Sequence, residues 1–389
     1  MDELFEYMNN QIELKYNQFK RYIYNNLPWE SQMFALIGPR GVGKTTLFLQ
    51  HIKDDHEFNE ALYVSADHIY FANHSLLELA DEFYKFGGRY LYIDEIHNYE
   101  NWSKELKNIY DGYPELHVYF TGSSALNILG GEADLSRRAP IFHMQGLSFC
   151  EFLELKKNIK AKTFTLEEIL AEKAQLKGVK HPLPLFQEYL QRGYYPFMDD
   201  IAYEIRIEQI INATLQYDIP QTANLSIATS KKLKKLMAAI AESVPFKPNI
   251  TKLAKKIQSS RNSIEQYLSL MEDAGMISRL RSGHAVFAEL GKVEKIYLDN
   301  PTLMYALSGK NADIGTIRET FFANQMRLNH KVFASDVSDF NINGITFEIG
   351  GKSKTSSQIA DIENAYVVKD GIESGFGNII PLWCFGLNY

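Results

Sequence analysis

The stretch Gly38-Pro-Arg-Gly-Val-Gly-Lys44-Thr45-Thr46 decides the fold, because it fits the pattern G-x-x-x-x-G-K-[ST] in full. The glycines of such a loop let consecutive backbone N–H groups point at phosphate oxygens. The ammonium group of Lys44 would reach the β- and γ-phosphates, and the Thr45 hydroxyl would bind Mg²⁺. The candidate nucleotide contacts are therefore Gly38, Pro39, Arg40, Gly41, Val42, Gly43, Lys44, Thr45 and Thr46.

The residues on either side give this loop the context that it needs. Before the loop, Met33-Phe-Ala-Leu-Ile37 is a short apolar run that predicts a buried strand. After it, the spacing of Leu47, Phe48, Leu49 and Ile52 predicts a buried helix, whose N-terminus would point at the phosphates. Strand, loop and helix in this order favour a phosphate-binding loop over a chance glycine-rich turn.

Carboxylates for a magnesium–nucleotide site follow in Arg89-Tyr-Leu-Tyr-Ile-Asp94-Glu95, at the end of a second apolar strand. A helix is predicted before this strand, since Ser75 and Glu78 have the spacing of a capping box. In this arrangement Asp94 would hold Mg²⁺ through water. Glu95 would polarise the water that attacks the γ-phosphate, so binding and hydrolysis would depend on different residues.

A third strand, His117-Val-Tyr-Phe120, runs into Thr121-Gly-Ser123-Ser124. Thr121 or Ser123 would orient the lytic water or sense the γ-phosphate. Alternatively, Ser123 or Ser124 caps a short helix that begins at Ala125.

Two arginines, Arg137 and Arg138, precede a further strand at 141–144. A guanidinium group supplied in cis or from a neighbouring subunit can neutralise charge on the transferred phosphoryl group. Adjacent arginines are also common as plain surface charge, so both interpretations stay open.

Composition and charge limit the class of protein. A chain of 389 residues predicts about two or three domains, and 45% hydrophobic with 23% charged residues is ordinary for a globular protein. Cys150 and Cys384 are far apart and lack metal-ligand spacing, which argues against a disulfide framework or a zinc site. The polar N-terminus and the lack of a long apolar stretch predict a cytoplasmic protein with no membrane partner.

Five stretches, taken in order, resemble the AAA-type prokaryotic ATPases that carry a C-terminal domain of unknown function. The resemblance extends across the chain, and it implies an α/β P-loop NTPase core over residues 1–146 that uses ATP and Mg²⁺, with homo-oligomers possible. It also implies a parallel sheet in which the strand at 117–120 lies between the strands that lead to Lys44 and Asp94. The stretches are GPRGVGKTT at 38–46, LYIDEIHNYENWSKELKNIYD at 91–111, FTGSSAL at 120–126, DLSRRAP at 134–140 and GLSFCEFL at 146–153.

The same resemblance implies a helical lid over residues 147–219. In related ATPases a Gly-x-Pro-like turn packs near the adenine, and Gly193-Tyr-Tyr-Pro196 resembles it with one extra residue. Pro196 is thus a candidate adenine contact. Equally, the turn simply ends a helix.

A polar, Ser/Thr-rich interval at 220–230 predicts a linker, and residues 231–290 resemble a winged helix. Helices are expected at 232–241, 249–257 and 260–274, followed by a strand at 276–281 and a wing at 285–287.

This part is basic, with seven Lys or Arg against three Asp or Glu between Lys247 and Gly283. If it binds DNA, the helix that begins at Ser260 would enter the major groove. Alternatively, it is a rigid protein–protein element or part of nucleotide sensing. The candidate phosphate contacts are Lys252, Lys255, Lys256, Arg261 and Arg281.

Residues 291–389 predict a C-terminal α/β domain that resembles restriction endonucleases. Glu319, Asp339, Glu348 and Lys352 are spaced similarly to the PD-(D/E)XK core, in which carboxylates hold a divalent metal. That pattern has one residue between acid and lysine, whereas three separate Glu348 from Lys352. A bulge could restore the geometry, but an inactive nuclease-like fold is favoured over a second metal site at Asp339, Glu348 and Lys352.

The sequence therefore predicts an ATP-hydrolysing molecular switch that couples its nucleotide state to C-terminal modules binding DNA or a protein client. One alternative is a nucleotide-gated binding module with little hydrolysis. Another is an ATP-regulated DNA nuclease. The client, the oligomeric state and the subunit in which Arg137 or Arg138 acts stay open at this point.

Overall fold

A computed structural model describes residues 1–57, 59–123, 135, 137–243, 245, 247–283, 291–309 and 312–389. These residues divide into two compact units. The first unit comprises Met1–Gln145 together with Asp218–Leu225, and the second comprises Gly146–Tyr217 together with Ser226–Tyr389.

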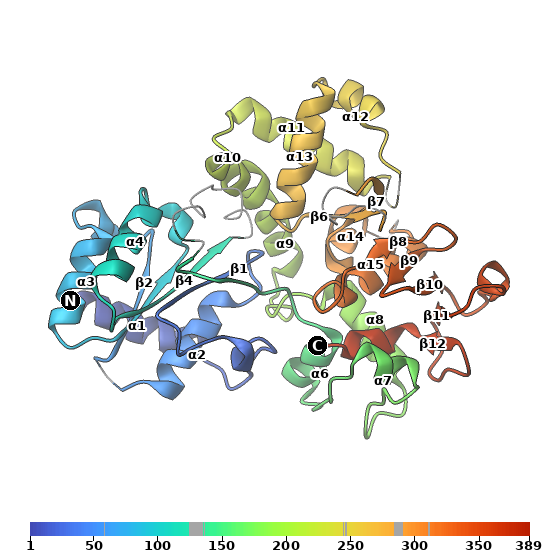
Figure 1. Cartoon of the computed structure of the whole chain (residues 1–389), viewed down its shortest axis with the longest axis horizontal. Helices are drawn as coiled ribbons and strands as arrows, with labels where there is room; N and C mark the ends of the chain where they lie inside the picture. The colour runs from blue at the N-terminus through green and yellow to red at the C-terminus, as the bar shows by residue number, and fades with distance from the viewer. Residues whose placement is uncertain are drawn as a thin grey trace. The chain divides into compact units, whose positions relative to one another are not determined.

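The first unit is built on a parallel sheet, and its described strands follow the order β2-β3-β4-β1-β5 (Figure 1). Strand β4 lies between β1 and β3, which confirms the arrangement implied by the family resemblance. The strand order could not come from periodicity, because it depends on long-range pairing. The strands are β1 (Met33–Gly38), β2 (Ala61–Ser65), β3 (Tyr90–Asp94), β4 (His117–Ser123) and β5 (Ile141–His143).

Helices cover both faces of this sheet, so its central strands are buried on both sides. On one face Phe48 of α2 packs against Phe34 and Tyr92. On the other, side chains of α3 and α4 pack against Leu91 and Ile93. The described helices of this unit are α1 (Asp2–Lys15), α2 (Lys44–Asp55), α3 (Leu76–Lys85), α4 (Trp102–Gly112) and α10 (Ile219–Thr222), with 3₁₀ turns η1 (Tyr24–Asn26), η2 (Ile69–Ala72) and η3 (Ile96–Asn98).

The second unit begins with helices and continues into a helical segment joined to a β-hairpin. In this segment β6 pairs with β7 in antiparallel orientation, and α11, α12 and α13 precede β6. The elements are α6 (Phe149–Lys157), α7 (Leu166–Leu170), α8 (Pro182–Arg192), α9 (Tyr203–Ala213), the π-helical turn η5 (Thr214–Asp218), α11 (Ile227–Ala241), α12 (Ile250–Ile257), α13 (Arg261–Asp273), β6 (Ile277–Arg281) and β7 (Val293–Leu298).

A mixed sheet with the described order β12-β11-β10-β9-β8 completes the second unit. Phe322 of α15 packs against Phe340 and Phe347 of this sheet. The elements are α14 (Pro301–Ser308), α15 (Ile314–Met326), β8 (Phe333–Ala334), β9 (Phe340–Ile342), β10 (Ile345–Gly350), η8 (Ser357–Ile359), β11 (Ala365–Lys369), β12 (Ile379–Pro381) and η9 (Leu382–Leu387).

The interval 220–230, predicted to be a linker, contains the point where the chain passes from the first unit to the second, between Leu225 and Ser226, but helices take up most of it. Ile219 and Pro220 are buried in the short helix α10, and α11 already begins at Ile227. Ser/Thr-rich composition was misleading here, because Ser226 caps a helix by accepting a hydrogen bond from the N–H of Thr229.

Two other expectations concern segments without a described structure. The wing expected at 285–287 and the helix expected from Ala125 lie outside the described residues. Within the described part of the chain, no helix is both long and apolar enough to cross a membrane.

Candidate functional site

The phosphate loop joins β1 to α2 and takes a backbone path that requires glycine. Gly41 and Gly43 have φ angles of 79° and 102°, in the left-handed region that other residues rarely adopt. At Gly38 the restriction is steric, since a Cβ atom there would overlap the carbonyl oxygen of Met144. The glycines of the motif are thus needed for the shape of the loop.

Lys44 is the first residue of α2, and its side chain turns back over the loop. Its Nζ donates hydrogen bonds to the carbonyl oxygens of Gly38 at 2.8 Å and Pro39 at 3.1 Å. Burial lowers the pKa of Lys44, while the negative charges of Glu95 and Asp94 act in the opposite direction. The loop therefore holds a buried amine beside carboxylates, where an anionic phosphate would stabilise its charged form.

Asp94 ends β3, and hydroxyl groups from other elements converge on its buried carboxylate. Thr45 donates a hydrogen bond to Oδ2 at 2.7 Å, and Tyr63 of β2 donates to the same oxygen at 2.8 Å. Thr121 of β4 donates to Oδ1. The residues predicted to bind magnesium, Thr45 and Asp94, are thus in direct contact.

Tyr63 was not identified by sequence reasoning, although it belongs to this site. Burial raises the pKa of Tyr63, and the charge of Asp94 raises it further, so the phenol remains a hydrogen-bond donor. The apolar run Ala61-Leu-Tyr-Val-Ser65 could have predicted a strand, but its side-chain contact with Asp94 depends on the pairing of β2 with β3.

Glu95 follows β3 in a left-handed backbone conformation, with φ at 53°. Its N–H donates a hydrogen bond to the Thr121 hydroxyl at 3.0 Å, which fixes the turn. Non-glycine residues in this conformation cost about 1–3 kcal/mol and cluster at active sites. The conformation places the carboxyl group at the end of the strand that carries Asp94.

One oxygen of the Glu95 carboxyl group accepts no hydrogen bond from a described residue. This oxygen, Oε2, lies 3.3 Å from Nε2 of His97, and neither atom makes a hydrogen bond with a described residue. Burial lowers the pKa of His97, although the nearby Glu95 raises it, so the imidazole is neutral near pH 7. A carboxylate of this kind can accept a proton from water.

The remaining predicted residues of the first unit have different surroundings. Ser123 Oγ is buried and has no hydrogen-bond partner among the described residues, while Ser124 lies outside them. Arg138 forms a two-point ion pair with Asp111 of α4, with distances of 2.9 and 3.0 Å. Arg137 is exposed. Of the two arginines, Arg137 is the one that lies open to solvent.

Arg40 of the phosphate loop makes a contact that sequence reasoning missed. Its Nε and Nη2 donate to the two carboxylate oxygens of Asp218 at 2.7 and 2.8 Å. Asp218 is buried, with 2% of the residue exposed, and it is the last residue of η5. The residues are 178 positions apart in the chain, so no local pattern could connect them.

Pro196, the candidate adenine contact, lies in the second unit, whereas Lys44 and Asp94 lie in the first. Gly193 is the C-cap of α8, so the turn at 193–196 does end a helix, as the alternative interpretation holds.

The C-terminal acids of the nuclease-like pattern take part in different ion pairs. Lys295 Nζ lies 3.0 Å from Glu319 Oε2 and 3.0 Å from Asp339 Oδ1, which places a lysine between these two carboxylates. Glu348 instead pairs with Lys354. Lys352 is exposed. Among the described residues, no group of three or more His, Cys, Asp or Glu is arranged to hold a metal ion.

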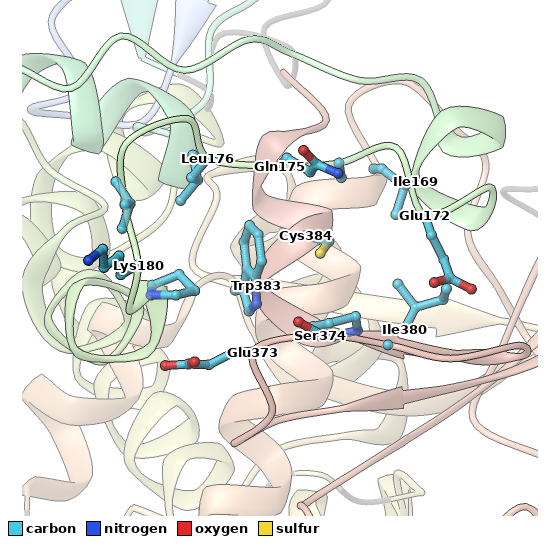
Figure 2. A pocket seen from close by; sticks show the side chains of 15 residues that line it. Ile169, Glu172, Gln175, Leu176, Lys180, Glu373, Ser374, Ile380, Trp383 and Cys384 are labelled. Atoms are coloured by element: carbon cyan, nitrogen blue, oxygen red, sulfur yellow. The ribbon is translucent and has the colours of Figure 1, made fainter.

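A cavity of about 430 Å³ in the second unit is a further candidate site (Figure 2). Gln175 and Leu176 approach it from one segment, and Trp383 and Cys384 from the C-terminal 3₁₀ helix η9. Burial raises the pKa of the Cys384 thiol, which leaves it protonated and a poor nucleophile. The cavity offers walls for binding, and its described lining residues contain no nucleophile paired with a histidine.

Comparison with known proteins identifies the two parts of the chain. Residues 30–153 match the family model described as an AAA domain, and residues 183–314 match a model described as a domain of unknown function. Residues 30–153 are thus similar to an AAA domain, and residues 183–314 are similar to a domain of unknown function.

One curated relative is the uncharacterized protein MJ1637 of Methanocaldococcus jannaschii. It is 27% identical over 299 residues, which cover 71% of this chain and 62% of the relative. The match thus spans about three fifths of that protein's length.

Similar solved structures include a variant of RuvB from Thermotoga maritima, which is 14% identical to this chain with a TM-score of 0.29. The match covers 72% of this chain and 89% of that chain. Another is the Hsp104–ADP complex of S. cerevisiae, with 17% identity, coverages of 69% and 38%, and a TM-score of 0.27. These scores are too low to carry an argument.

Proposed function

Because residues 30–153 match an AAA domain, we propose that this protein binds and hydrolyses ATP and acts as a nucleotide-dependent molecular switch. The observation that supports the proposal best is the convergence of Thr45, Tyr63 and Thr121 on the carboxylate of Asp94. Hydroxyl and carboxylate oxygens are the ligands that Mg²⁺ prefers beside nucleotide phosphates. The buried amine of Lys44 adds the cation that such a site needs.

In this proposal each residue has a separate role. The backbone N–H groups of residues 38–46 bind the phosphates, and Lys44 binds the β- and γ-phosphoryl oxygens. Thr45 and Asp94 would hold Mg²⁺, which neutralises charge on the phosphates. Glu95 accepts a proton from the attacking water, while the Thr121 hydroxyl accepts a hydrogen bond from the N–H of Glu95 and so holds the turn in place.

Steady-state hydrolysis by the full chain tests this function. We expect Glu95→Gln to lower kcat by about 100-fold or more, because general-base catalysis typically contributes that much. Glu100→Gln is the matched control, since Glu100 is an exposed glutamate of the same segment. Turnover by the wild type that does not exceed that of Glu95→Gln would favour the alternative, a nucleotide-gated binding protein with little hydrolysis.

Ser123 and Arg137 complete the proposed site. Ser123 has a buried hydroxyl that is unpaired among the described residues, and it ends the strand that carries Thr121. Arg137 is the better candidate for a contact to a neighbouring copy, because Arg138 is held by Asp111. If Arg137 acts in trans, kcat per subunit rises with protein concentration in the wild type and stays low in Arg137→Ala.

We further propose that the segment from α11 to β7 acts as a winged helix that binds DNA. The exposed surfaces of α12 and α13 carry Lys252, Lys255 and Arg261. Arg281, predicted to contact phosphate, is instead paired with Glu272 at 2.6 Å, as is Arg279. Phosphate contacts would therefore come from the two helices rather than from β6.

Salt dependence of DNA binding tests this module. Each lost phosphate contact changes the slope of log K against log salt by about 0.9, so Lys252→Ala with Lys255→Ala should reduce it by about 2. Lys173→Ala with Lys177→Ala is the control, because both lysines are exposed elsewhere in the second unit. An unchanged slope, or no DNA binding at all, leaves a protein client as the partner of this surface.

The contacts of the C-terminal sheet favour a nuclease-like domain that does not cleave DNA. Lys295 bridges Glu319 and Asp339, where a nuclease would place its metal, and Glu348 lies in another ion pair. We therefore expect no metal-dependent cleavage. Cleavage that disappears in Asp339→Ala with Glu348→Ala would show instead that the site is an active nuclease.

A further inference from the structure

Arg40 occupies a position in the phosphate loop that has no fixed role in the motif, since it is one of the four variable residues between Gly38 and Gly43. Its side chain is nevertheless held firmly. Both Nε and Nη2 donate to the carboxylate of Asp218, and the Asp218 side chain is 3% exposed. A two-point contact fixes the plane of a guanidinium group as well as its position.

This geometry leaves part of the guanidinium group open. A guanidinium group has five N–H donors, and Asp218 takes one from Nε and one from Nη2. Nη1 makes no hydrogen bond to a described residue, and the Arg40 side chain is 34% exposed. Asp218 thus orients the guanidinium group along the edge formed by Nε and Nη2, and the N–H groups of Nη1 remain available as donors.

The charge of Arg40 also acts on the groups proposed to take part in the reaction. The charge of Arg40 lowers the pKa of Lys44 and of His97, after the larger effect of burial in each case. Glu95 in turn helps to raise the pKa of Arg40, although the hydrogen bonds to Asp218 are the largest cause. Arg40 therefore lies within electrostatic reach of both the phosphate-binding lysine and the proposed general base.

A second cation beside Lys44 needs an explanation, because like charges at one site repel each other. Asp218 neutralises one charge of the pair Arg40 and Lys44. The remaining positive charge is matched when a triphosphate binds, and most strongly when negative charge develops on the γ-phosphoryl oxygens during hydrolysis.

From this arrangement we infer that Arg40 is a catalytic residue that contacts the γ-phosphoryl group through Nη1, and that Asp218 positions it. The inference rests on the proposed hydrolysis of ATP. In that step water forms a bond to the γ-phosphorus, the bond from phosphorus to the β–γ bridging oxygen breaks, and Glu95 takes a proton from the water. ADP leaves with the electron pair of the broken bond. Arg40 stabilises the charge on the transferred group and exchanges no proton.

One consequence separates this role from that of an arginine supplied by a neighbouring copy. Arg40 and Asp218 belong to the same unit of the same chain. Arg40→Ala should therefore lower kcat by the same factor at low and at high protein concentration.

Nucleotide binding gives the first test, in a Glu95→Gln background that slows turnover. We expect ATP to bind about 10-fold or more tightly than ADP in that background, because only ATP offers the γ-phosphoryl group to Nη1. Addition of Arg40→Ala should remove most of this preference while the affinity for ADP stays within about 3-fold. A preference for ATP that Arg40→Ala leaves unchanged would overturn the contact.

Turnover gives the second test. Loss of one donor to developing charge typically costs about 100- to 1000-fold in kcat, so Arg40→Ala should fall in that range with little change in KM. The complex of ADP with aluminium fluoride, which mimics the transferred group, should form in the wild type and not in Arg40→Ala. Equal trapping by both would contradict a catalytic role.

Asp218 is tested as a positioning residue. Asp218→Asn keeps the shape but loses the charge, and we expect kcat to fall about 5- to 20-fold with KM unchanged. The matched control is Asp370→Asn, which breaks the ion pair of a similarly buried aspartate with Arg318 in the second unit. A change in KM alone, or equal effects on kcat in both variants, would contradict the positioning role and leave Asp218 with a structural role.

These results also separate the two proposals. If Glu95→Gln leaves turnover unchanged, the proposed function fails and the role of Arg40 fails with it. If Glu95→Gln abolishes turnover and Arg40→Ala does not, the ATPase stands and the inference about Arg40 is wrong.

Discussion

At the scale of single residues, the site depends on buried hydroxyl groups as much as on its charged residues. The carboxylate of Asp94 is buried, and a buried carboxylate needs hydrogen-bond donors that replace water. Thr45, Tyr63 and Thr121 supply them from three different elements. Each hydroxyl therefore helps to orient the residue proposed to hold the metal.

Tyr63→Phe removes one of these donors and leaves the ring in place. We expect a loss of about 1 kcal/mol in the free energy of unfolding and a fall of about 3- to 10-fold in kcat. Tyr113→Phe, which deletes a hydroxyl bonded to Asp81 at 2.9 Å on α3, is the control. If the two variants behave alike in turnover, the Tyr63 hydroxyl has no part in the site.

His51 gives a prediction about pH. Burial lowers the pKa of His51 to about 4, and its ring stacks on Trp29 at 3.6 Å between centroids. Because the unfolded chain binds a proton near pH 6.5 and the folded chain does not, the folded state loses stability as pH falls below about 6.5. The loss from this residue between pH 7.5 and 5 is about 2 kcal/mol.

Chemical denaturation at several pH values measures this effect. His51→Asn should show a smaller decrease in the free energy of unfolding on acidification than the wild type, even if the variant is less stable at pH 7.5. Identical pH dependence in the two proteins would contradict the assignment.

The sequence predicts those residues of the site that belong to a pattern of neighbouring positions in the chain. The loop at 38–46 and the pair Asp94 and Glu95 could be identified because strand, turn and helix positions follow one another in the chain. Tyr63 and Asp218 could not, since each reaches the site through contacts between distant segments. The role of Arg40 was hidden for the same reason.

At the scale of elements, the prediction succeeded where a pattern was long or was capped. The helix α3 has the predicted capping box of Ser75 with Glu78, and it buries Leu76, Leu79, Ala80 and Phe83. The helices α12 and α13 also lie within the predicted ranges 249–257 and 260–274. The short strand β2 was not predicted, because four apolar residues followed by Ser65 do not by themselves distinguish a strand from part of a helix.

The join between β1 and the phosphate loop gives a prediction at this scale. Gly38→Ala would place a Cβ against the backbone carbonyl of Met144, so the ends of β1 and β5 must separate. We expect a loss of about 1–3 kcal/mol in stability together with at least a 10-fold loss of nucleotide affinity. The backbone atom cannot rotate away as a side chain would.

The control for this variant is Gly112→Ala at the end of α4, where an added Cβ would meet nothing within 4 Å. Alanine is the better helix former, so this change should be neutral or stabilise by up to about 1 kcal/mol. Thermal unfolding with and without ATP compares the two. A stable Gly38→Ala protein that binds ATP normally would contradict the steric argument.

At the scale of the whole molecule, the two units have separate cores and should unfold separately. Trp29 and Trp102 lie in the first unit and Trp383 in the second. A ligand that binds one unit stabilises that unit by about 2.7 kcal/mol at 100 times its dissociation constant. ATP should therefore raise the midpoint temperature of the unfolding transition that Trp29 and Trp102 report.

Calorimetry and fluorescence of single-tryptophan variants measure this. We expect two unfolding transitions, and ATP should shift the midpoint temperature only of the transition that belongs to the first unit. In Lys44→Ala, ATP should shift neither midpoint. Equal shifts of both transitions would show that the units unfold as one.

The return of residues 218–225 to the first unit has a consequence for biosynthesis. The segment 146–217 leaves the first unit and the chain comes back to it at Asp218, so this unit is interrupted in sequence while continuous in space. During translation the loop arginine cannot meet its partner until more than half of the 389 residues have been made. A nascent chain stopped before residue 218 therefore contains the whole phosphate loop and lacks the contact that orients Arg40. If Arg40 acts as proposed, such a chain would gain the ability to bind nucleotide on the ribosome before it gains the ability to hydrolyse it.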